Sequence, residues 1–479
     1  MVVYKGQIKS MIIEQIYTGC LAQGAYYVES NGEVAIIDPL REVQDYIDRA
    51  ENNKAKIKYI FETHFHADFV SGHVTLAEKT GAQIVYGPTA KTSFDALIAE
   101  DHQVFKLGDI TITVLHTPGH TMESACFLLK DENGKDYALF SGDTLFLGDV
   151  GRPDLAQKGD ITDKDLAGFL YDSLRTKVMT LADDVIVYPA HGAGSACGKN
   201  LSKETVGTIG NQKETNYALR VNMSKEEFIK EVTDGLLPPP AYFPLNVKLN
   251  KEGYKDIDDV IKTSAKPLSV KDFELVANTT DAIVLDVRHQ SEFIKGFIPQ
   301  SIFIGVDGGF APWVGALIKD INQPILLVSP VGREEEVITR LSRVGFDNVL
   351  GYLEGSFASW QKAEKEIDTL TSVSADVLED KIKENAIVFD VRKPGEYDSE
   401  HIENVNNTPL DFLNNHISEF PKKDDFYVHC AGGYRSVIAS SILKARGFHN
   451  VIDVAGGYAA IRNTNIKRTE KAVCPSTLK

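Results

Sequence analysis

The sequence contains few cysteines, and they are not arranged in pairs. Its 479 residues include five, namely Cys20, Cys126, Cys197, Cys430 and Cys474. The number is odd and no CxxC pair occurs, which argues against a disulfide framework and against a structural zinc site. We therefore expect any functional cysteine to act as a single thiol.

Positive charge is also scarce. Lys and Arg number 51 against 68 Asp and Glu, which gives a formal net charge of −17. This balance argues against binding to nucleic acid or to a membrane surface, because both require a basic face. An anionic small substrate would need positive charge placed locally.

The chain lacks an apolar run long enough to cross a bilayer, and its start, MVVYKGQIKSMIIEQIYTGC, does not resemble a secretory signal. We expect a cytoplasmic protein. The length and the 43% hydrophobic composition predict two to four domains. The stiff segment LPPPAYFP, residues 237–244, predicts the exit from the first domain, which we place at residues 1–245.

In this first domain, apolar strand-like runs repeatedly end in polar clusters. IKYIFE leads into THFHAD, ITITVL into HTPGHT, YALF into SGDTLF, and VIVYP into AHGAGS. Loops at strand ends can present side chains toward one spot, so the clusters predict a common site.

The rest of the chain contains an internal repeat. DAIVLDVRHQSEFIKGFIPQS, from residue 281, matches NAIVFDVRKPGEYDSEHIENV, from residue 385, and Gly345 and Gly447 mark equivalent later points. Buried strands alternate with helical patterns in each copy, which is typical of a parallel sheet covered by helices. We predict an α/β multidomain chain with a linker at 246–265 and two small domains at 266–366 and 370–470.

The polar clusters resemble the metallo-β-lactamase superfamily, whose fold is an αββα sandwich. The family's HxHxDH loop matches His64, His66 and Asp68, and its later ligands match His120, Asp143 and His191 in order. In two-metal members, the histidine that ends the loop helps to hold the second ion, and here this position is Phe69. The resemblance therefore implies that the second ligand set is incomplete.

Within the superfamily, SGDTLF followed by DVGRPDL, and AHGAGSACGKN, look most like the persulfide dioxygenases. These hold one ferrous iron, so the resemblance implies one Fe(2+) per chain. Two imidazoles and one carboxylate leave positions open for oxygen and a substrate sulfur. The residues that the resemblance assigns to the iron are His64, His120 and Asp143, with His66, Asp68 and His191 as outer groups that orient ligands or meet substrate.

Three other residues near this site have alternative readings. His73 lies one helical turn beyond Phe69 and could replace the lost ligand, although a full turn carries it about 5 Å along the axis. Arg152 could bind a carboxylate of the substrate, or it could be an exposed arginine of a solvated loop. Cys197 is a candidate sulfur relay, with Lys199 nearby to favour its thiolate.

VHCAGGYRS, residues 428–436, places a thiol in a backbone cradle. Cys430 follows a buried-type strand, and two glycines lead into a helical pattern. Successive N–H groups and a helix N-terminus stabilise a thiolate, which predicts a nucleophile. The loop CAGGYR, with Asp390 and Arg392 of the DVR motif, resembles the rhodanese sulfurtransferases. The resemblance implies Cys430 and Arg435 as catalytic residues, and Gly432, Gly433, Tyr434 and Ser436 as substrate-binding residues.

The first copy keeps the DVR motif, with Asp286 and Arg288, but its loop reads VSPVGRE and is shorter by two residues. Pro330 stands where the thiol should be and offers neither a nucleophile nor an N–H group. We predict an inactive copy that acts as a spacer or docking domain.

The two sites together predict one pathway of sulfide detoxification or assimilation. The iron site would convert a low-molecular-weight persulfide, O2 and water into sulfite and a thiol, and Cys430 would exchange sulfur between persulfide, sulfite and thiosulfate. One rival is a zinc thioester hydrolase of the glyoxalase II kind with a sulfurtransferase attached. Another is a sensing protein with an inactive metal domain. The thiol carrier, the direction of sulfur flux and the oligomeric state, a homo-oligomer included, stay open.

Overall fold

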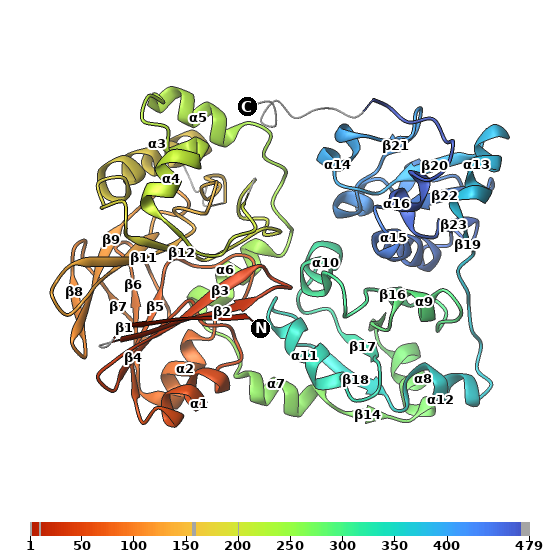
Figure 1. Ribbon diagram of the computed structural model, residues 1–479. Coiled ribbons are helices and arrows are strands. Elements are labelled where there is room, and N and C mark those ends of the chain that lie inside the picture. Colours follow the sequence, from red (N-terminus) through yellow and green to blue (C-terminus); the bar gives the residue numbers. More distant parts are fainter. Residues whose placement is uncertain (1, 9–10, 156–159, 200, 471–479) are drawn as a thin grey trace. The chain divides into compact units, whose positions relative to one another are not determined.

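The computed structural model describes residues 2–8, 11–155, 160–199 and 201–470 (Figure 1). They form two compact units. The first contains the described residues up to Asp259 together with Ser342–Gly345, and the second contains the remainder.

One seven-stranded sheet of the first unit follows the chain order β1 to β7. Its strands are β1 (Val2–Ile8), β2 (Met11–Thr18), β3 (Gln23–Ser30), β4 (Glu33–Ile37), β5 (Lys56–Glu62), β6 (Gln83–Tyr86) and β7 (Leu97–Ile98). Strands β1 to β4 pair antiparallel, and β4 to β7 pair parallel.

A six-stranded sheet, in the order β13-β12-β11-β10-β9-β8, faces the first. Its strands are β8 (Val104–Leu107), β9 (Ile110–His116), β10 (Ala125–Lys130), β11 (Asp136–Gly142), β12 (Ile186–Pro189) and β13 (Gly207–Thr208). Phe61 of the first sheet and Phe127 and Phe140 of the second share one buried cluster between the sheets. Burying the inner faces of both sheets in this way makes them a sandwich.

Helices cover both outer faces of the sandwich, so the predicted αββα arrangement is confirmed. Helices α1 (Gln44–Asn52) and α2 (His73–Thr80) bury Tyr46 and Leu76 against one sheet. Over the other sheet lie α3 (Asp163–Ser173), the π-helical turn η1 (Leu174–Val178), α4 (Ile209–Thr215), the 3-10 turn η2 (Tyr217–Leu219) and α5 (Lys225–Thr233). Capping boxes at Thr162 and Ser224 start α3 and α5.

The predicted linker is helical. It contains most of α6 (Phe243–Glu252), whose second residue is a proline, and α7 (Ile257–Ser264). Proline fits the first turn of a helix, because the N–H it lacks has no partner there. Helix α6 packs within the first unit, where Asn246 and Asn250 are buried.

The second unit contains two five-stranded sheets, and every strand pair in them is parallel. The first copy has β14 (Pro267–Leu268), β15 (Ile283–Asp286), β16 (Ile302–Phe303), β17 (Ile325–Val328) and β18 (Val349–Leu353). The second has β19 (Ser372–Val373), β20 (Ile387–Asp390), β21 (Asn406–Asn407), β22 (Phe426–His429) and β23 (Val451–Val454). The orders β14-β18-β17-β15-β16 and β19-β23-β22-β20-β21 are equivalent, which confirms the repeat.

The helices of the two copies also correspond. The first copy has α8 (Val270–Thr279), α9 (Gln290–Phe293), α10 (Phe310–Leu317), α11 (Glu334–Ser342) and α12 (Ser356–Lys362). The second has α13 (Ala375–Lys383), α14 (Pro394–Ser399), the 3-10 turns η3 (Leu410–Asn415) and η4 (Ile417–Glu419), α15 (Tyr434–Ala445) and α16 (Gly457–Ile461). Gly345 and Gly447 adopt the same left-handed conformation, with φ of 85° and 86°.

Helices long and apolar enough to cross a bilayer are not found in the described part of the chain.

Candidate functional site

Loops after four strands bring six ionisable side chains of the first unit together. His64, His66 and Asp68 follow β5, His120 follows β9, Asp143 follows β11 and His191 follows β12. All six are buried. The strand-end clusters of the sequence therefore meet in one place.

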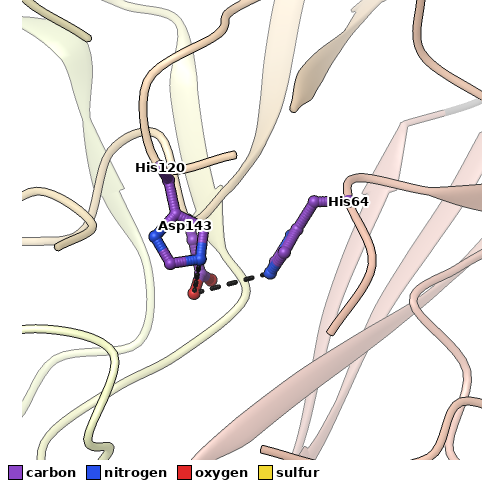
Figure 2. A group of neighbouring side chains, drawn as sticks. All are labelled: His64, His120 and Asp143. Carbon is purple, nitrogen blue, oxygen red and sulfur yellow. Dashed lines mark ion pairs between the residues drawn. The ribbon is translucent and has the colours of Figure 1, made fainter. Parts of the chain in front are cut away.

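His64, His120 and Asp143 form one group of possible metal ligands (Figure 2). Oδ2 of Asp143 lies 3.7 Å from Nε2 of His64 and 3.4 Å from Nε2 of His120. The other ring nitrogens have partners of their own. Nδ1 of His64 lies 3.0 Å from Oγ1 of Thr63, and Nδ1 of His120 lies 2.8 Å from the carbonyl oxygen of Arg152. These contacts fix both rings with Nε2 toward the carboxylate.

The residues of this group fit a cation. Both carboxylate oxygens of Asp143 are buried without a hydrogen-bond partner, which is costly unless another group neutralises them. Burial, together with neighbouring histidines, lowers the pKa of His64 well below its ordinary value, so its ring is neutral and can donate a lone pair. Two imidazoles and one carboxylate are a set that transition metals accept.

His66 faces a different pair of acids. Its Nε2 lies 3.1 Å from Oδ1 of Asp38 and 3.5 Å from Oε2 of Glu62. Burial disfavours the charged ring, but Asp38 and Glu62 outweigh it and raise the pKa of His66 to about 9. In this arrangement His66 is an ion-pair partner, and its outer role at the metal stays a prediction.

Asp68 and His191 lie on the other side of Asp143. Nε2 of His191 is 3.5 Å from Oδ2 of Asp68 and 3.5 Å from Oδ1 of Asp143. Burial raises the pKa of the Asp68 carboxyl group. Phe69 is fully buried and its ring packs on His66, with centroids 4.4 Å apart. Phe69 therefore adds an apolar wall here and no ligand.

His73 contacts an acid and three aromatic rings, none of which belongs to the group His64, His120 and Asp143. Its Nδ1 lies 3.5 Å from Oε1 of Glu62, and its ring contacts the rings of Tyr86, Phe94 and Tyr254. Among the described residues, no cluster with metal-ligand spacing includes it. The structure gives no support to the alternative that His73 replaces the lost ligand.

Arg152 is buried rather than solvated, so the exposed-loop alternative is wrong. Its guanidinium donates two hydrogen bonds to Asp154, one to the carbonyl of Leu237 and one to that of Ala196. Its own carbonyl orients His120. A role in holding a substrate carboxylate stays a prediction, with most of its donors already engaged.

Cys197 is buried beside the metal group, and its Sγ forms a possible ligand set with Asp143 and His191. Burial, and after it the charges of Asp68 and Asp143, raise the pKa of this thiol well above its ordinary value. The ammonium of Lys199 instead contacts the carbonyl oxygen of Glu231, at 2.9 Å. The surroundings therefore favour the thiol over the thiolate, and the relay role stays a prediction.

Asn250 of α6 is a supporting residue that the sequence reasoning missed. Its Nδ2 donates to the carbonyl oxygens of His66 and Phe69, both at 2.8 Å, and its Oδ1 accepts from the N–H of Ser71. These bonds hold the metal loop from a helix more than 170 residues later in the chain. An asparagine in a helical pattern gave no local signal of this contact.

In the second unit, Cys430 lies between β22 and α15. The N–H of Gly433 donates to its Sγ at 3.1 Å, and Gly433 has the left-handed φ of 96° that a non-glycine residue rarely adopts. The backbone N–H groups of Tyr458 and Ala459 donate to the carbonyl oxygens of Cys430 and Ala431, respectively. One backbone N–H thus reaches the sulfur at the start of α15, and a cradle of several N–H groups stays a prediction.

The residues predicted to act with Cys430 differ in how far they are exposed to solvent. Gly432 is exposed and Ser436 is buried. The guanidinium of Arg435 forms a two-pronged ion pair with Glu396 of α14, with distances of 2.6 and 2.8 Å. Arg435 therefore ties the loop to α14.

Tyr434 connects the loop with the first copy. Its hydroxyl donates to the carbonyl oxygen of Gly305 at 2.7 Å. A Cβ atom added at Gly308 would lie 2.3 Å from Cζ of Tyr434, so only glycine leaves room for the ring. This contact between the copies was not visible in the sequence.

The first copy has no thiol at the matching loop. After β17, Ser329 donates to the carbonyl oxygen of Pro330, and Val331 is 72% exposed. Arg333 pairs with Asp307 and Glu336. The loop carries no nucleophile, as the sequence already indicated.

Comparison with known proteins gives the same domain order. Residues 18–191 match the metallo-beta-lactamase superfamily, and residues 269–363 and 374–464 match the rhodanese-like domain. A hydroxyacylglutathione hydrolase of Haemophilus influenzae is 30% identical over 187 residues, covering 34% of this chain and 82% of that protein. The mitochondrial persulfide dioxygenase of Mus musculus is 29% identical over 220 residues, covering 46% of this chain and 78% of that protein.

A crystal structure described as a metallo-beta-lactamase from Staphylococcus aureus subsp. aureus COL aligns over 72% of this chain and 99% of its own. The TM-score is 0.63 and the identity is 30%. The predicted fold class is confirmed by these matches.

Proposed function

Because this chain belongs to the metallo-β-lactamase superfamily and carries two rhodanese-like domains, we propose that it is a persulfide dioxygenase fused to a sulfurtransferase. The observation that carries the proposal is the buried group His64, His120 and Asp143 beside Phe69, which offers one cation three ligands. The similarity to a persulfide dioxygenase supports it.

In the first reaction, a persulfide RSSH, O2 and water give RSH, sulfite and two protons, so the outer sulfur is oxidised and O2 is reduced. One ferrous iron held by His64, His120 and Asp143 would supply the redox chemistry. The protein's part is to fix the two rings through Thr63 and the carbonyl of Arg152. Asn250 holds the loop that follows His64, through its bond to the carbonyl oxygen of His66.

In the second reaction, the Cys430 thiolate attacks the outer sulfur of a persulfide, and the displaced thiolate RS⁻ leaves. Sulfite then attacks that sulfur and departs as thiosulfate, which frees the Cys430 thiolate again. The N–H of Gly433 stabilises the negative charge on Sγ in both steps. The sulfite made at the metal is thereby consumed, and the chain would act in sulfide metabolism in the cytoplasm.

The experiment measures the metal content and then follows oxygen uptake, sulfite and thiosulfate with the persulfides of glutathione and of mercaptohexanoate. Cys430→Ser should still consume oxygen but accumulate sulfite. His64→Ala is the reciprocal variant, which should lose oxygen uptake and keep sulfur transfer from thiosulfate to cyanide. Loss of both activities in Cys430→Ser would contradict the separation of the two sites.

The rival function is a thioester hydrolase, which the hydroxyacylglutathione hydrolase relative represents. It needs one or two zinc ions that activate water. A pair of zinc ions in the purified protein, with hydrolysis of lactoylglutathione and no oxygen uptake, would favour it. Phe69 weighs against the two-zinc form, because this side chain offers no ligand, so a second ion would have only the group His66, Asp68 and His191.

A further inference from the structure

Helix α6 has two faces with different partners. On one face lie Asn246 and Asn250, which are buried, and Asn250 is hydrogen-bonded to the metal loop. Side chains four residues apart share a face of a helix. Phe243, Val247 and Lys251 follow this spacing, and all three line one cavity.

The cavity has a volume of about 640 Å³, and the metal-group residue His120 forms part of its wall. Pockets of roughly 300–1,000 Å³ are the size that holds a small-molecule ligand. A molecule in this cavity therefore lies next to the metal group. Arg152, a candidate for binding a substrate carboxylate, is not among the residues that line it.

The walls of the cavity are mostly apolar, with Phe65, Met122, Phe243 and Val247 among them. Apart from His120, the described lining residues carry one positive charge, that of Lys251, and one negative charge, that of Glu123. Glu123 already accepts a hydrogen bond from the N–H of Phe65 at 3.1 Å.

The ammonium of Lys251 lies over the ring of Phe65, 4.8 Å from its centroid. Phe65 stands between His64 and His66 in the chain, so this cation is held against the metal loop itself. In a chain with a net charge of −17, it provides the local positive charge that an anionic substrate requires.

We propose that this cavity binds the thiol carrier of the persulfide, and that it selects a carrier with an apolar body and a single anionic group, which Lys251 binds. The inference rests on the proposed dioxygenase function and names its substrate class. A carrier with several charges, such as glutathione, would bring charged groups without partners against Phe243 and Val247, and burying such groups is costly.

The experiment compares oxygen uptake with the persulfides of mercaptohexanoate, of mercaptohexanol and of glutathione. The first two share an apolar body and differ in one negative charge. For the parent protein, kcat/KM should be about tenfold higher for the hexanoate than for the hexanol, as expected for one charge-assisted hydrogen bond.

Lys251→Met should remove this preference by raising KM for the hexanoate, with kcat nearly unchanged, because the lost contact binds substrate and transition state alike. Lys251→Arg should restore it. Lys248→Met is the matched control, since Lys248 lies on the same helix, is exposed and pairs with Glu252. Equal kcat/KM for the hexanoate and the hexanol in the parent, or an unchanged preference in Lys251→Met, would overturn the inference.

A binding measurement separates this inference from the proposed function. The S-methyl thioether of mercaptohexanoate cannot be oxidised as a persulfide, and its affinity is measured by calorimetry. It should bind the parent about tenfold more tightly than Lys251→Met. Binding of this kind without oxygen uptake from any persulfide would refute the dioxygenase and leave the subsite standing. Oxygen uptake without such binding would refute the subsite alone.

Discussion

The two rhodanese-like copies hold the turn after their second strand, β15 or β20, in the same way. In the first, the guanidinium of Arg288 donates to both carboxylate oxygens of Asp286, and in the second Arg392 does the same with Asp390. Both aspartates are fully buried. The contact that stabilises the fold is therefore present in both copies, whether or not the copy carries a nucleophile.

The surroundings of these arginines match as well. Each guanidinium donates to a carbonyl eight residues later, Gly296 in the first copy and Glu400 in the second. Each also lies over an aromatic ring, Phe357 or Tyr458, at 4.3 and 3.8 Å. Such agreement shows that the duplicated residues serve packing.

The copies differ at the loop after the fourth strand in chain order. The second copy has Cys430 with the N–H of Gly433 on its sulfur, and the first has Pro330. The first copy instead supplies Gly305 and Gly308, against which Tyr434 packs. The comparison indicates that the first copy lacks the nucleophile and instead supports the loop of the second.

The largest effect is expected from breaking the shared ion pair. Arg288→Met and Arg392→Met should each lower the free energy of unfolding by about 3–5 kcal/mol, because a buried carboxylate is left without its partner. Urea denaturation followed by circular dichroism measures the shift. Adding Asp390→Asn to Arg392→Met should recover part of the loss. A large cost in only one copy would show that the pairs are not equivalent.

A smaller effect is expected from filling the space beside Gly308 that the ring of Tyr434 occupies. Gly308→Ala should lower kcat/KM for sulfur transfer from thiosulfate to cyanide by about tenfold to a hundredfold, because the new methyl group displaces the ring that begins α15. Gly309→Ala is the control, since its Cβ would lie 3.4 Å from Trp313, an ordinary contact. Equal activities in the two variants would remove the supporting role.

The smallest effect is expected from returning a thiol to the first copy. Pro330→Cys, made in the Cys430→Ser background, should give no detectable sulfur transfer to cyanide. The loop is shorter by two residues and lacks the pair of adjacent glycines that in the second copy includes Gly433, whose N–H donates to Sγ of Cys430. Measurable transfer in this variant would mean that the missing thiol alone explains the inactivity.

Much of the metal site was predictable because its residues follow strands. The periodic apolar runs before His64, His120, Asp143 and His191 identify strand ends, and strands of a sandwich end near one another. Cys430 was predictable for a similar reason, since two glycines after a strand form a local cradle. These signals are contained within a few neighbouring residues.

The supporting contacts were not predictable in this way. Asn250 reaches His66 from a helix inside a segment expected to be a linker, and the Arg152 carbonyl orients His120. Arg152 was a candidate for binding a substrate carboxylate, while the cation that lines the cavity is Lys251. Each of these contacts joins residues far apart in the chain, so no local pattern marks them.

The sequence by itself thus determined the positions of the strands and the residue types that follow them, because short-range periodicity marks where a strand ends. Tertiary packing decided the hydrogen-bond partners of the site residues. It also decided that Lys251 lines the cavity and that the first copy supports Tyr434. The reason is physical: hydrogen bonds and ring contacts depend on distances that exist only once remote segments have come together.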